Sequence, residues 1–298
     1  TKGQGMSVLS TDQPPQVMKP HRVAKIMAPV VIVLIGVAIV LYPVVATVVN
    51  NMQQQKIAEE YVEQFQDVDP IELKAAVDKA HAYNAEHAGQ PVLDPWLARI
   101  SPDNEGYNEY LEQLSGATAM SRATIPSIDV KLPLYHGTAE STLQKGLGHL
   151  YGSALPVGGK GMRTVITGHT GLTNATLFDD LDQVEKGDAI YVETFGETLK
   201  YEVFDTEIVL PTEVTGLTPV EGEDLVTLIT CTPYGVNTHR LLVHAKRVPL
   251  DATDKEAIDK SGRTIQWWMI ALSLFGLVVI GALTYWVMRE IRKARSHV

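Results

Sequence analysis

The only cysteine in the chain stands where a thiol can act as a nucleophile. Cys231 follows the β-prone run 225–230 and precedes the turn-forming segment Thr232-Pro233-Tyr234-Gly235. A thiol at the end of a strand, beside a loop, can be presented to solvent and can attack an electrophilic carbon. A small, inert core residue is the other common role of a single cysteine, and the spacing alone does not decide between the two.

A guanidinium group lies nine positions after Cys231 in the sequence. Arg240 begins the next β-prone run, 241–247, so the two runs are expected to form an antiparallel hairpin that brings Arg240 near Cys231. In that position the side chain can donate hydrogen bonds to an oxyanion on an acyl carbon, or to a substrate backbone. From the residues alone, a surface arginine in a salt bridge is the alternative.

A histidine flanked by glycines is the candidate acid and base. His169 lies in Gly168-His169-Thr170-Gly171, directly after a predicted strand at 164–167. The glycines allow close backbone approach and let the imidazole face a cleft. Periodicity does not select this histidine over the others in the same part of the chain, which are His136, His149, His239 and His244.

The elements around these residues are short and mainly β. After Gly116 the sequence consists of short β-prone runs separated by glycine and proline, and this spacing favours a sandwich or a closed barrel. The predicted strands are Ala123–Ile125, Ile128–Leu132, Thr164–Thr167, Ala189–Thr194, Glu197–Ile208, Leu225–Thr230 and Leu241–Arg247.

Helices are predicted before these strands. One covers 50–65, and a second runs from Pro70 to Ala88, with Asp69 as its cap and Glu72 completing a capping box. A short amphipathic segment at 107–114 leads into the β-rich region.

Two segments, Met27–Val49 and Trp267–Met288, are predicted to span a membrane. Each has about the twenty apolar residues that a bilayer requires, and neither contains an ionisable side chain. A cleaved signal peptide ending near Val44-Val45-Ala46 is the alternative for the first, but its apolar run is longer than is usual for a signal. Basic residues flank both segments on the sides of the chain termini, so both termini are expected in the cytoplasm and the middle of the chain outside.

The composition restricts the class of partner and cofactor. A formal net charge of -10 argues against nucleic acid as a partner. With one cysteine the chain has no intramolecular disulfide, so the outer region must rely on its hydrophobic core. The sequence contains no Cys/His metal spacing and no calcium-loop pattern, so no cofactor is expected.

The motifs around the candidate residues resemble those of sortases. The resemblance covers about residues 50–250 in the family's order. It is carried by Thr227-Leu228-Ile229-Thr230-Cys231 with Arg240 nine positions on, by Val165–Leu172, by Ile125–Val130, by Leu132–Thr138 and by Gly148–Ser153. Within the family, the two predicted spans and Asp94-Pro95-Trp96 are similar to class C, the pilin polymerases.

The resemblance implies a mainly β fold, a closed sortase-type β-barrel with short helices. Together with the predicted spans and their flanking charges, it gives an organisation of cytoplasmic tail (1–26), transmembrane helix (27–49), N-terminal helical region with a lid loop (50–115), barrel (116–250), linker (251–266), transmembrane helix (267–288) and basic cytoplasmic tail (289–298). The barrel would face outward from a Gram-positive cell.

The resemblance also implies the role of each candidate. Cys231 would be the nucleophile, His169 the general acid and base, Arg240 the stabiliser of substrate and oxyanion, and Thr230 a substrate-binding residue. The segment Asp94, Pro95 and Trp96 resembles a lid, with Asp94 facing the arginine and Trp96 covering the thiol. Without the family, a proline-initiated turn would explain this tripeptide.

The implied reaction is a two-step acyl transfer. The thiol would cleave an LPXTG-like sorting signal between Thr and Gly and form a thioester, which a lysine amine of a pilin would then resolve. One alternative is a housekeeping sortase that uses an amine of a peptidoglycan precursor. The other is a catalytically silent binding module on the cell surface.

Overall fold

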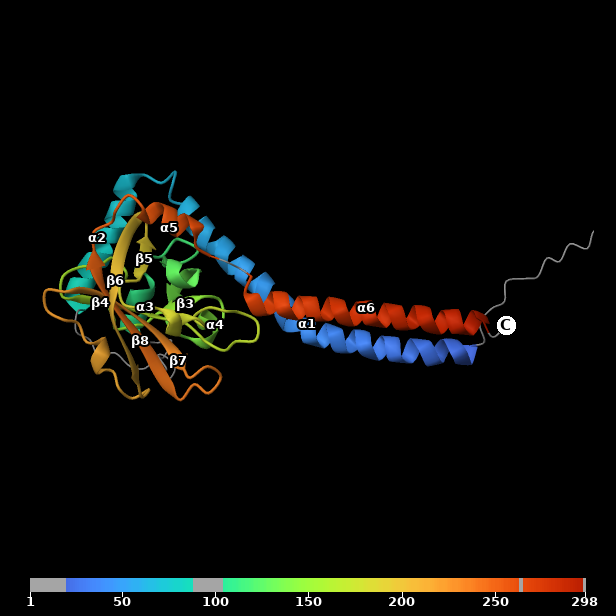
Figure 1. The fold of residues 1–298 in the computed structure, drawn as a ribbon. Coiled ribbons are helices and arrows are strands. Elements are labelled where there is room, and N and C mark those ends of the chain that lie inside the picture. The colour runs from blue at the N-terminus through green and yellow to red at the C-terminus, as the bar shows by residue number, and fades with distance from the viewer. Residues whose placement is uncertain (1–19, 88–103, 263–264, 297–298) are drawn as a thin grey trace, which may run out of the picture. The chain divides into compact units, whose positions relative to one another are not determined.

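The computed structural model describes residues 20–87, 104–262 and 265–296 (Figure 1). The α-helices are α1 Pro20–Glu63, α2 Pro70–His87, α3 Glu105–Leu111, α4 Glu140–Leu143, α5 Asp254–Lys260 and α6 Trp267–Ser296. The strands are β1 Ser121–Ile125, β2 Val130–His136, β3 Leu147–His149, β4 Met162–Thr167, β5 Ala189–Thr194, β6 Glu197–Val209, β7 Asp224–Thr232 and β8 His239–Val248. Three 3-10 turns are η1 Pro126–Ile128, η2 Leu181–Gln183 and η3 Thr215–Leu217.

Two compact units make up this structure. Pro43–Gln266 forms one unit, and the described residues up to Tyr42 form the other together with those from Trp267 onward. Helix α1 contributes to both, because it continues from the apolar unit into the β-rich one.

The strands of Pro43–Gln266 form a closed barrel in the order β1-β2-β3-β4-β7-β8-β6-β5. The pairs β2/β3 and β4/β7 are parallel, and the other pairs are antiparallel. The predicted closed barrel is confirmed, and closure leaves the sheet without an unpaired edge. A sandwich is excluded.

One strand of the barrel was absent from the sequence prediction, which had seven. Strand β3 covers only Leu147–His149 and includes Gly148, so it is too short to show an alternating pattern. Pairing with adjacent strands stabilises β3, since it lies parallel to β2 and antiparallel to β4. Strand β2 also begins later than predicted, at Val130, because Pro126–Ile128 forms a 3-10 turn.

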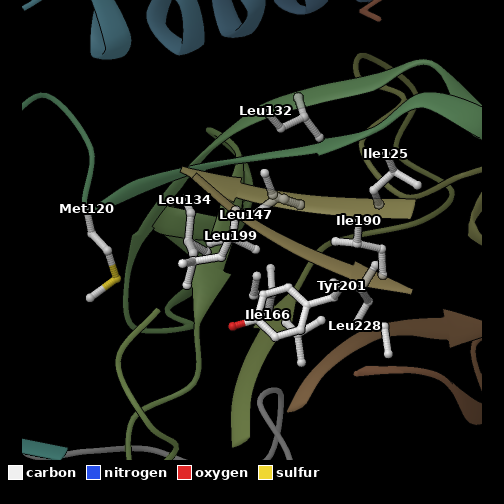
Figure 2. Packing of buried hydrophobic residues seen from close by; sticks show 14 of the residues in the cluster. Met120, Ile125, Leu132, Leu134, Leu147, Ile166, Ile190, Leu199, Tyr201 and Leu228 are labelled. Atoms are coloured by element: carbon white, nitrogen blue, oxygen red, sulfur yellow. The ribbon is translucent and has the colours of Figure 1, made fainter. Parts of the chain in front are cut away.

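The barrel interior is packed with large apolar side chains (Figure 2). Leu134, Leu147, Ile166, Leu228 and Tyr201 come from five different strands, and each is at most 1% exposed. Burial of a side chain of this size contributes about 1.5–3 kcal/mol, so the closed core is the main source of stability. It holds the strand ends, and the candidate residues on them, in fixed positions.

Helices cover part of the barrel. Val77, Ala80 and Tyr83 of α2 belong to the same core cluster as the strands. Asn84 exchanges two hydrogen bonds with the main chain of Leu155, at 3.2 and 2.7 Å. The predicted cap of α2 is present, since the N–H of Ile71 donates to Oδ1 of Asp69 at 2.9 Å.

The segment predicted as a linker contains the short helix α5. Asp254 in its first turn is buried and accepts a hydrogen bond from the Tyr191 hydroxyl at 2.6 Å, and it also pairs with Lys200. These contacts tie the segment after β8 to strands β5 and β6. Part of the predicted linker is therefore packed against the barrel.

The other unit consists of α6 and the part of α1 up to Tyr42. Within α1, residues from Ala24 to Glu63, and within α6, residues from Trp267 to Lys293, are long and apolar enough to cross a membrane. The parts of α1 and α6 in this unit lie side by side (Figure 1). They approach closely at Gly276, where a Cβ atom would lie 3.2 Å from a methyl carbon of Leu41.

Candidate active site

The hairpin of β7 and β8 carries two of the candidate residues. Cys231 and Arg240 are direct partners in the antiparallel register, one step before Thr232 and His239, the pair next to the loop that connects the two strands. Directly opposite residues of an antiparallel pair have Cβ atoms about 4.5–5.5 Å apart and lie on the same face. The predicted hairpin is therefore confirmed, and it brings the thiol and the guanidinium together.

Strand β4 brings His169 to the same end of the barrel. It runs parallel to β7 with Thr167 aligned to Ile229, so His169 and Cys231 each lie two residues beyond that pair. The alignment continues past the strand, because the N–H of Gly168 donates to the carbonyl of Ile229 at 3.1 Å. The Thr230 hydroxyl then donates to the carbonyl of Gly168 at 2.8 Å.

The environments of Cys231 and Arg240 differ from the alternatives that the sequence left open, an inert core cysteine and a surface arginine. Cys231 is half-buried at the strand end and is not enclosed in the core. Arg240 is only 7% exposed, so it is not a surface arginine. Its Nη1 donates to the main-chain carbonyls of His239 at 3.2 Å and Asn237 at 3.5 Å, which orients the guanidinium.

His169 contacts a carboxylate that sequence reasoning missed. Its Nε2 lies 3.2 Å from Oε2 of Glu140, the first residue of α4. The other carboxylate oxygen, Oε1, accepts a hydrogen bond from Nε2 of Gln144 at 2.9 Å. No signal in the sequence links Glu140 to His169, because the two residues lie 29 positions apart and the contact depends on how α4 packs on the barrel.

A second carboxylate supports the loop that carries His169. Oδ1 of Asp179 accepts hydrogen bonds from the N–H of Gly171 at 2.7 Å and from the hydroxyl of Thr170 at 3.2 Å. Burial raises the pKa of Asp179 to about 6, and the neighbouring Asp180 adds to the rise, while the two hydrogen bonds oppose it. This loop is therefore held by a carboxyl group that titrates well above its usual range.

Three of the four competing histidines make other contacts, and the fourth, His239, lies opposite Thr232 on β8. His149 is fully buried beside the Tyr110 hydroxyl, and burial lowers its pKa to about 4. His136 bonds to a main-chain carbonyl, and His244 is buried between strands in contact with Arg163. Among the histidines left open by the sequence, His169 is the one aligned with Cys231 across the β4–β7 pair.

The catalytic roles predicted for Cys231, His169 and Arg240 stay predictions, and so do the lid and the role of Thr230. Asp94, Pro95 and Trp96 lie outside the described residues, so the lid is not part of the site as described. Thr230 is 3% exposed, and the contact of its hydroxyl is with Gly168. Within residues 20–87, 104–262 and 265–296, no group of three or more His, Cys, Asp or Glu side chains is arranged to hold a metal ion.

Comparison with known proteins identifies a family for this arrangement. The family model described as Sortase domain matches residues 123–248. Three curated relatives are sortase A of Streptococcus agalactiae, sortase D of Bacillus subtilis and sortase A of Bacillus anthracis, which are 28%, 31% and 30% identical to the chain over 125, 128 and 124 residues, respectively. The chain spans only 50%, 61% and 57% of the length of these relatives.

Solved structures are similar over a longer stretch. Sortase C-1 from Actinomyces oris is 52% identical with a TM-score of 0.59, covering 61% of this chain and 100% of that one. A lid mutant of sortase A from Corynebacterium diphtheriae is 48% identical with a TM-score of 0.59, covering 63% and 100%. Sortase C from Streptococcus pneumoniae, described in relation to pilin substrate specificity, is 39% identical with a TM-score of 0.60, covering 66% and 98%.

Proposed function

This chain belongs to the sortase family, and we propose that it is a membrane-anchored cysteine transpeptidase that polymerises pilins. The observation that carries the proposal is the strand register, in which Cys231 is opposite Arg240 and His169 is aligned with Cys231 across β4 and β7. A nucleophile, an acid–base group and a cation at one end of a rigid barrel are the groups that acyl transfer through a thioester requires.

In the first step, the sulfur of Cys231 attacks the carbonyl carbon between Thr and Gly of an LPXTG-like sorting signal. The negative charge that develops on the carbonyl oxygen is stabilised by Arg240, whose guanidinium is already oriented by main-chain carbonyls. His169 donates a proton to the amine of the leaving glycine as the C–N bond breaks. The product is a thioester between the Thr carbonyl carbon and Cys231.

In the second step, a lysine amine of another pilin subunit attacks the thioester carbon. His169 accepts the proton from this amine, and the C–S bond breaks to return the thiolate. The similarity to Actinomyces and Streptococcus sortases C, one of them described in relation to pilin substrates, favours a pilin lysine. The similarity to curated sortases A supports the alternative acceptor, an amine of a peptidoglycan precursor.

A lid completes the proposal. We infer that Asp94, Pro95 and Trp96 cover the thiol in the resting enzyme and leave before the sorting signal binds. The similar lid mutant of Corynebacterium diphtheriae sortase A supports this reading, because a close relative has a segment named as a lid. The residues implied are Asp94 toward Arg240 and Trp96 over Cys231.

The proposed location is the outer face of the membrane of a Gram-positive bacterium. Both apolar helices are long enough to span a bilayer. Arg289, Arg292 and Lys293 lie at the C-terminal end of the second one, as expected for a cytoplasmic end. The catalytic barrel then lies outside, where sorting signals and pilin lysines are available.

The function is tested by incubating the full chain in detergent with a sorting-signal peptide. We expect cleavage between Thr and Gly, and we expect Cys231→Ala to abolish it. Glu256→Ala, on the short helix α5, serves as the control and should cleave like the parent. Cleavage that survives in the Cys231→Ala chain would overturn the proposal. Adding purified pilin to one reaction and a cell-wall amine to another identifies the acceptor.

A further inference from the structure

Glu140 is engaged through both oxygens of its carboxylate. One oxygen, Oε2, lies 3.2 Å from Nε2 of His169, and the other, Oε1, accepts from Nε2 of Gln144 at 2.9 Å. Glu140 begins α4, and the backbone N–H of Gln144 donates to the carbonyl of Glu140. Because residues four apart on a helix lie on the same face, the turn that places Gln144 also aims its amide at the carboxylate.

The short helix that carries this pair is held firmly on the barrel. Leu143 is 0% exposed and packs against β3 at Gly148. A Cβ atom at position 148 would lie 2.8 Å from Cδ2 of Leu143 and 2.5 Å from the carbonyl oxygen of Gly137, so only glycine admits this approach. The position of Glu140 is therefore fixed by the core and not by its own exposed side chain.

The backbone of His169 is held from the other side. Its carbonyl accepts a hydrogen bond from the N–H of Phe178 at 3.0 Å, and the preceding Gly168 donates to β7. With the main chain fixed, the orientation of the imidazole depends on its ring contacts. An ionised carboxylate only accepts hydrogen bonds, so a ring nitrogen that contacts it must carry a proton.

We propose that Glu140 is a positioning residue for His169, and that Gln144 orients Glu140 in turn. Glu140 keeps a proton on Nε2 whether the His169 ring is neutral or positively charged. The proton that the ring gives up and takes back during the reaction is therefore the one on Nδ1. During thioester formation Nδ1–H protonates the leaving amine, and during resolution Nδ1 accepts the proton of the incoming amine. The reaction steps rest on the proposed function, whereas the orientation of the ring does not.

The expected effect is modest because the Glu140 side chain is 61% exposed. Solvent screening limits an exposed charged pair to a rate effect of up to about fivefold. We therefore expect Glu140→Ala to lower kcat about fivefold and to leave KM within about twofold. Glu140→Gln should retain most of kcat, because its carboxamide oxygen can accept the same hydrogen bond once Gln144 turns its amide over.

The experiment measures kcat and KM of the full chain in detergent with a sorting-signal peptide. The variants are Glu140→Ala, Glu140→Gln and Gln144→Ala, and we expect Gln144→Ala to fall between the other two. Glu256→Ala is the matched control, since Glu256 lies on the short helix α5 and pairs with its own i+4 neighbour Lys260. A Glu140→Ala chain with the kcat of the parent would overturn the inference.

A second measurement does not depend on activity. Nitrogen-15 NMR of histidine-labelled full chain reports which ring nitrogen of His169 carries the proton when the ring is neutral. We expect Nε2–H in the parent and a mixture of both tautomers in Glu140→Ala. A parent ring protonated on Nδ1 overturns the inference. If the tautomer changes as expected but the parent does not cleave the peptide, the contact stands and the proposed function fails.

Discussion

Individual side chains in this site are held mainly through main-chain groups. Carbonyls of the β7–β8 turn orient Arg240, and the Thr230 hydroxyl ties β7 to the carbonyl that precedes His169. The residue types and their spacing made Cys231, His169 and Arg240 candidates, and the resemblance to sortases selected them over the alternatives. Glu140 and Asp179 could not be found in this way, because an acidic side chain gains such a role only from the packing of distant segments.

Asp179 gives the site loop a stability that depends on pH. Its pKa, about 6, lies above the unfolded value of 3.8, so the protonated form is favoured by folding. The stabilisation is complete below the unfolded value and is lost as the pH rises through about 6. Asp179→Asn keeps an oxygen that can accept both hydrogen bonds and removes the buried charge.

We therefore expect Asp179→Asn to exceed the parent in stability by about 1–2 kcal/mol at pH 7.5, after allowance for partial exposure. At pH 4 the two should be nearly equal. Denaturant unfolding of the full chain at both pH values measures this difference. A variant that is less stable than the parent at pH 7.5 would mean that the carboxylate is favoured in the fold.

The elements that position the site could be predicted where they are formed by residues that are close together in the sequence. The β7–β8 hairpin follows from two β-prone runs joined by a short turn, and strand β5 was predicted with its observed bounds. The parallel alignment of β4 with β7 could not be predicted, because 56 residues separate Thr167 from Asp224 and no local pattern sets this register. Strand β3 and helix α4 are too short to show a hydrophobic periodicity in the sequence.

Gly168 shows how closely these elements meet beside His169. A Cβ atom there would lie 2.6 Å from Cδ2 of Phe178 and 2.8 Å from Cδ2 of Leu147. We expect Gly168→Ala to destabilise the chain by about 1–3 kcal/mol and to reduce peptide cleavage further by shifting His169. Thermal unfolding and the cleavage assay test this, with Gly281→Ala, which has nothing within 4 Å, as the control. Full activity of the Gly168→Ala chain would refute the proposed packing.

Chemical modification of Cys231 tests whether the segment Asp94, Pro95 and Trp96 acts as a lid. Because the chain has one cysteine, an alkylating reagent reports on Cys231 alone. If the lid covers the thiol at rest, Asp94→Ala and Trp96→Ala should both be alkylated faster than the parent. The Cys231→Ala chain, which should take up no reagent, is the control. Identical alkylation rates in parent and variants would exclude a lid at these residues.

At the scale of the whole molecule, a folded barrel is joined in sequence to two apolar helices. Composition and charge predicted this division, since apolar runs and flanking basic residues can be read without knowing any contact. The barrel closes without a disulfide, and its stability comes from the core.

The proposed topology predicts which residues are reached from outside the cell. In a Cys231→Ala background, Glu221→Cys should react with a membrane-impermeant maleimide on intact cells, because the barrel is outside. Ser296→Cys should react only after the cells are permeabilised, because both termini are cytoplasmic. Labelling of Ser296→Cys on intact cells would reverse the orientation of the second span.

Thioester formation on Cys231 tests the central claim most directly. Intact-mass analysis of the full chain, mixed with a sorting-signal peptide and no amine acceptor, should show an adduct equal to the peptide up to Thr, with loss of the segment from Gly onward. Hydroxylamine should remove the adduct, Cys231→Ala should not form it, and Arg240→Ala should form it far more slowly. A cleaved peptide with no adduct on the parent chain, or the same adduct on Cys231→Ala, would contradict the account.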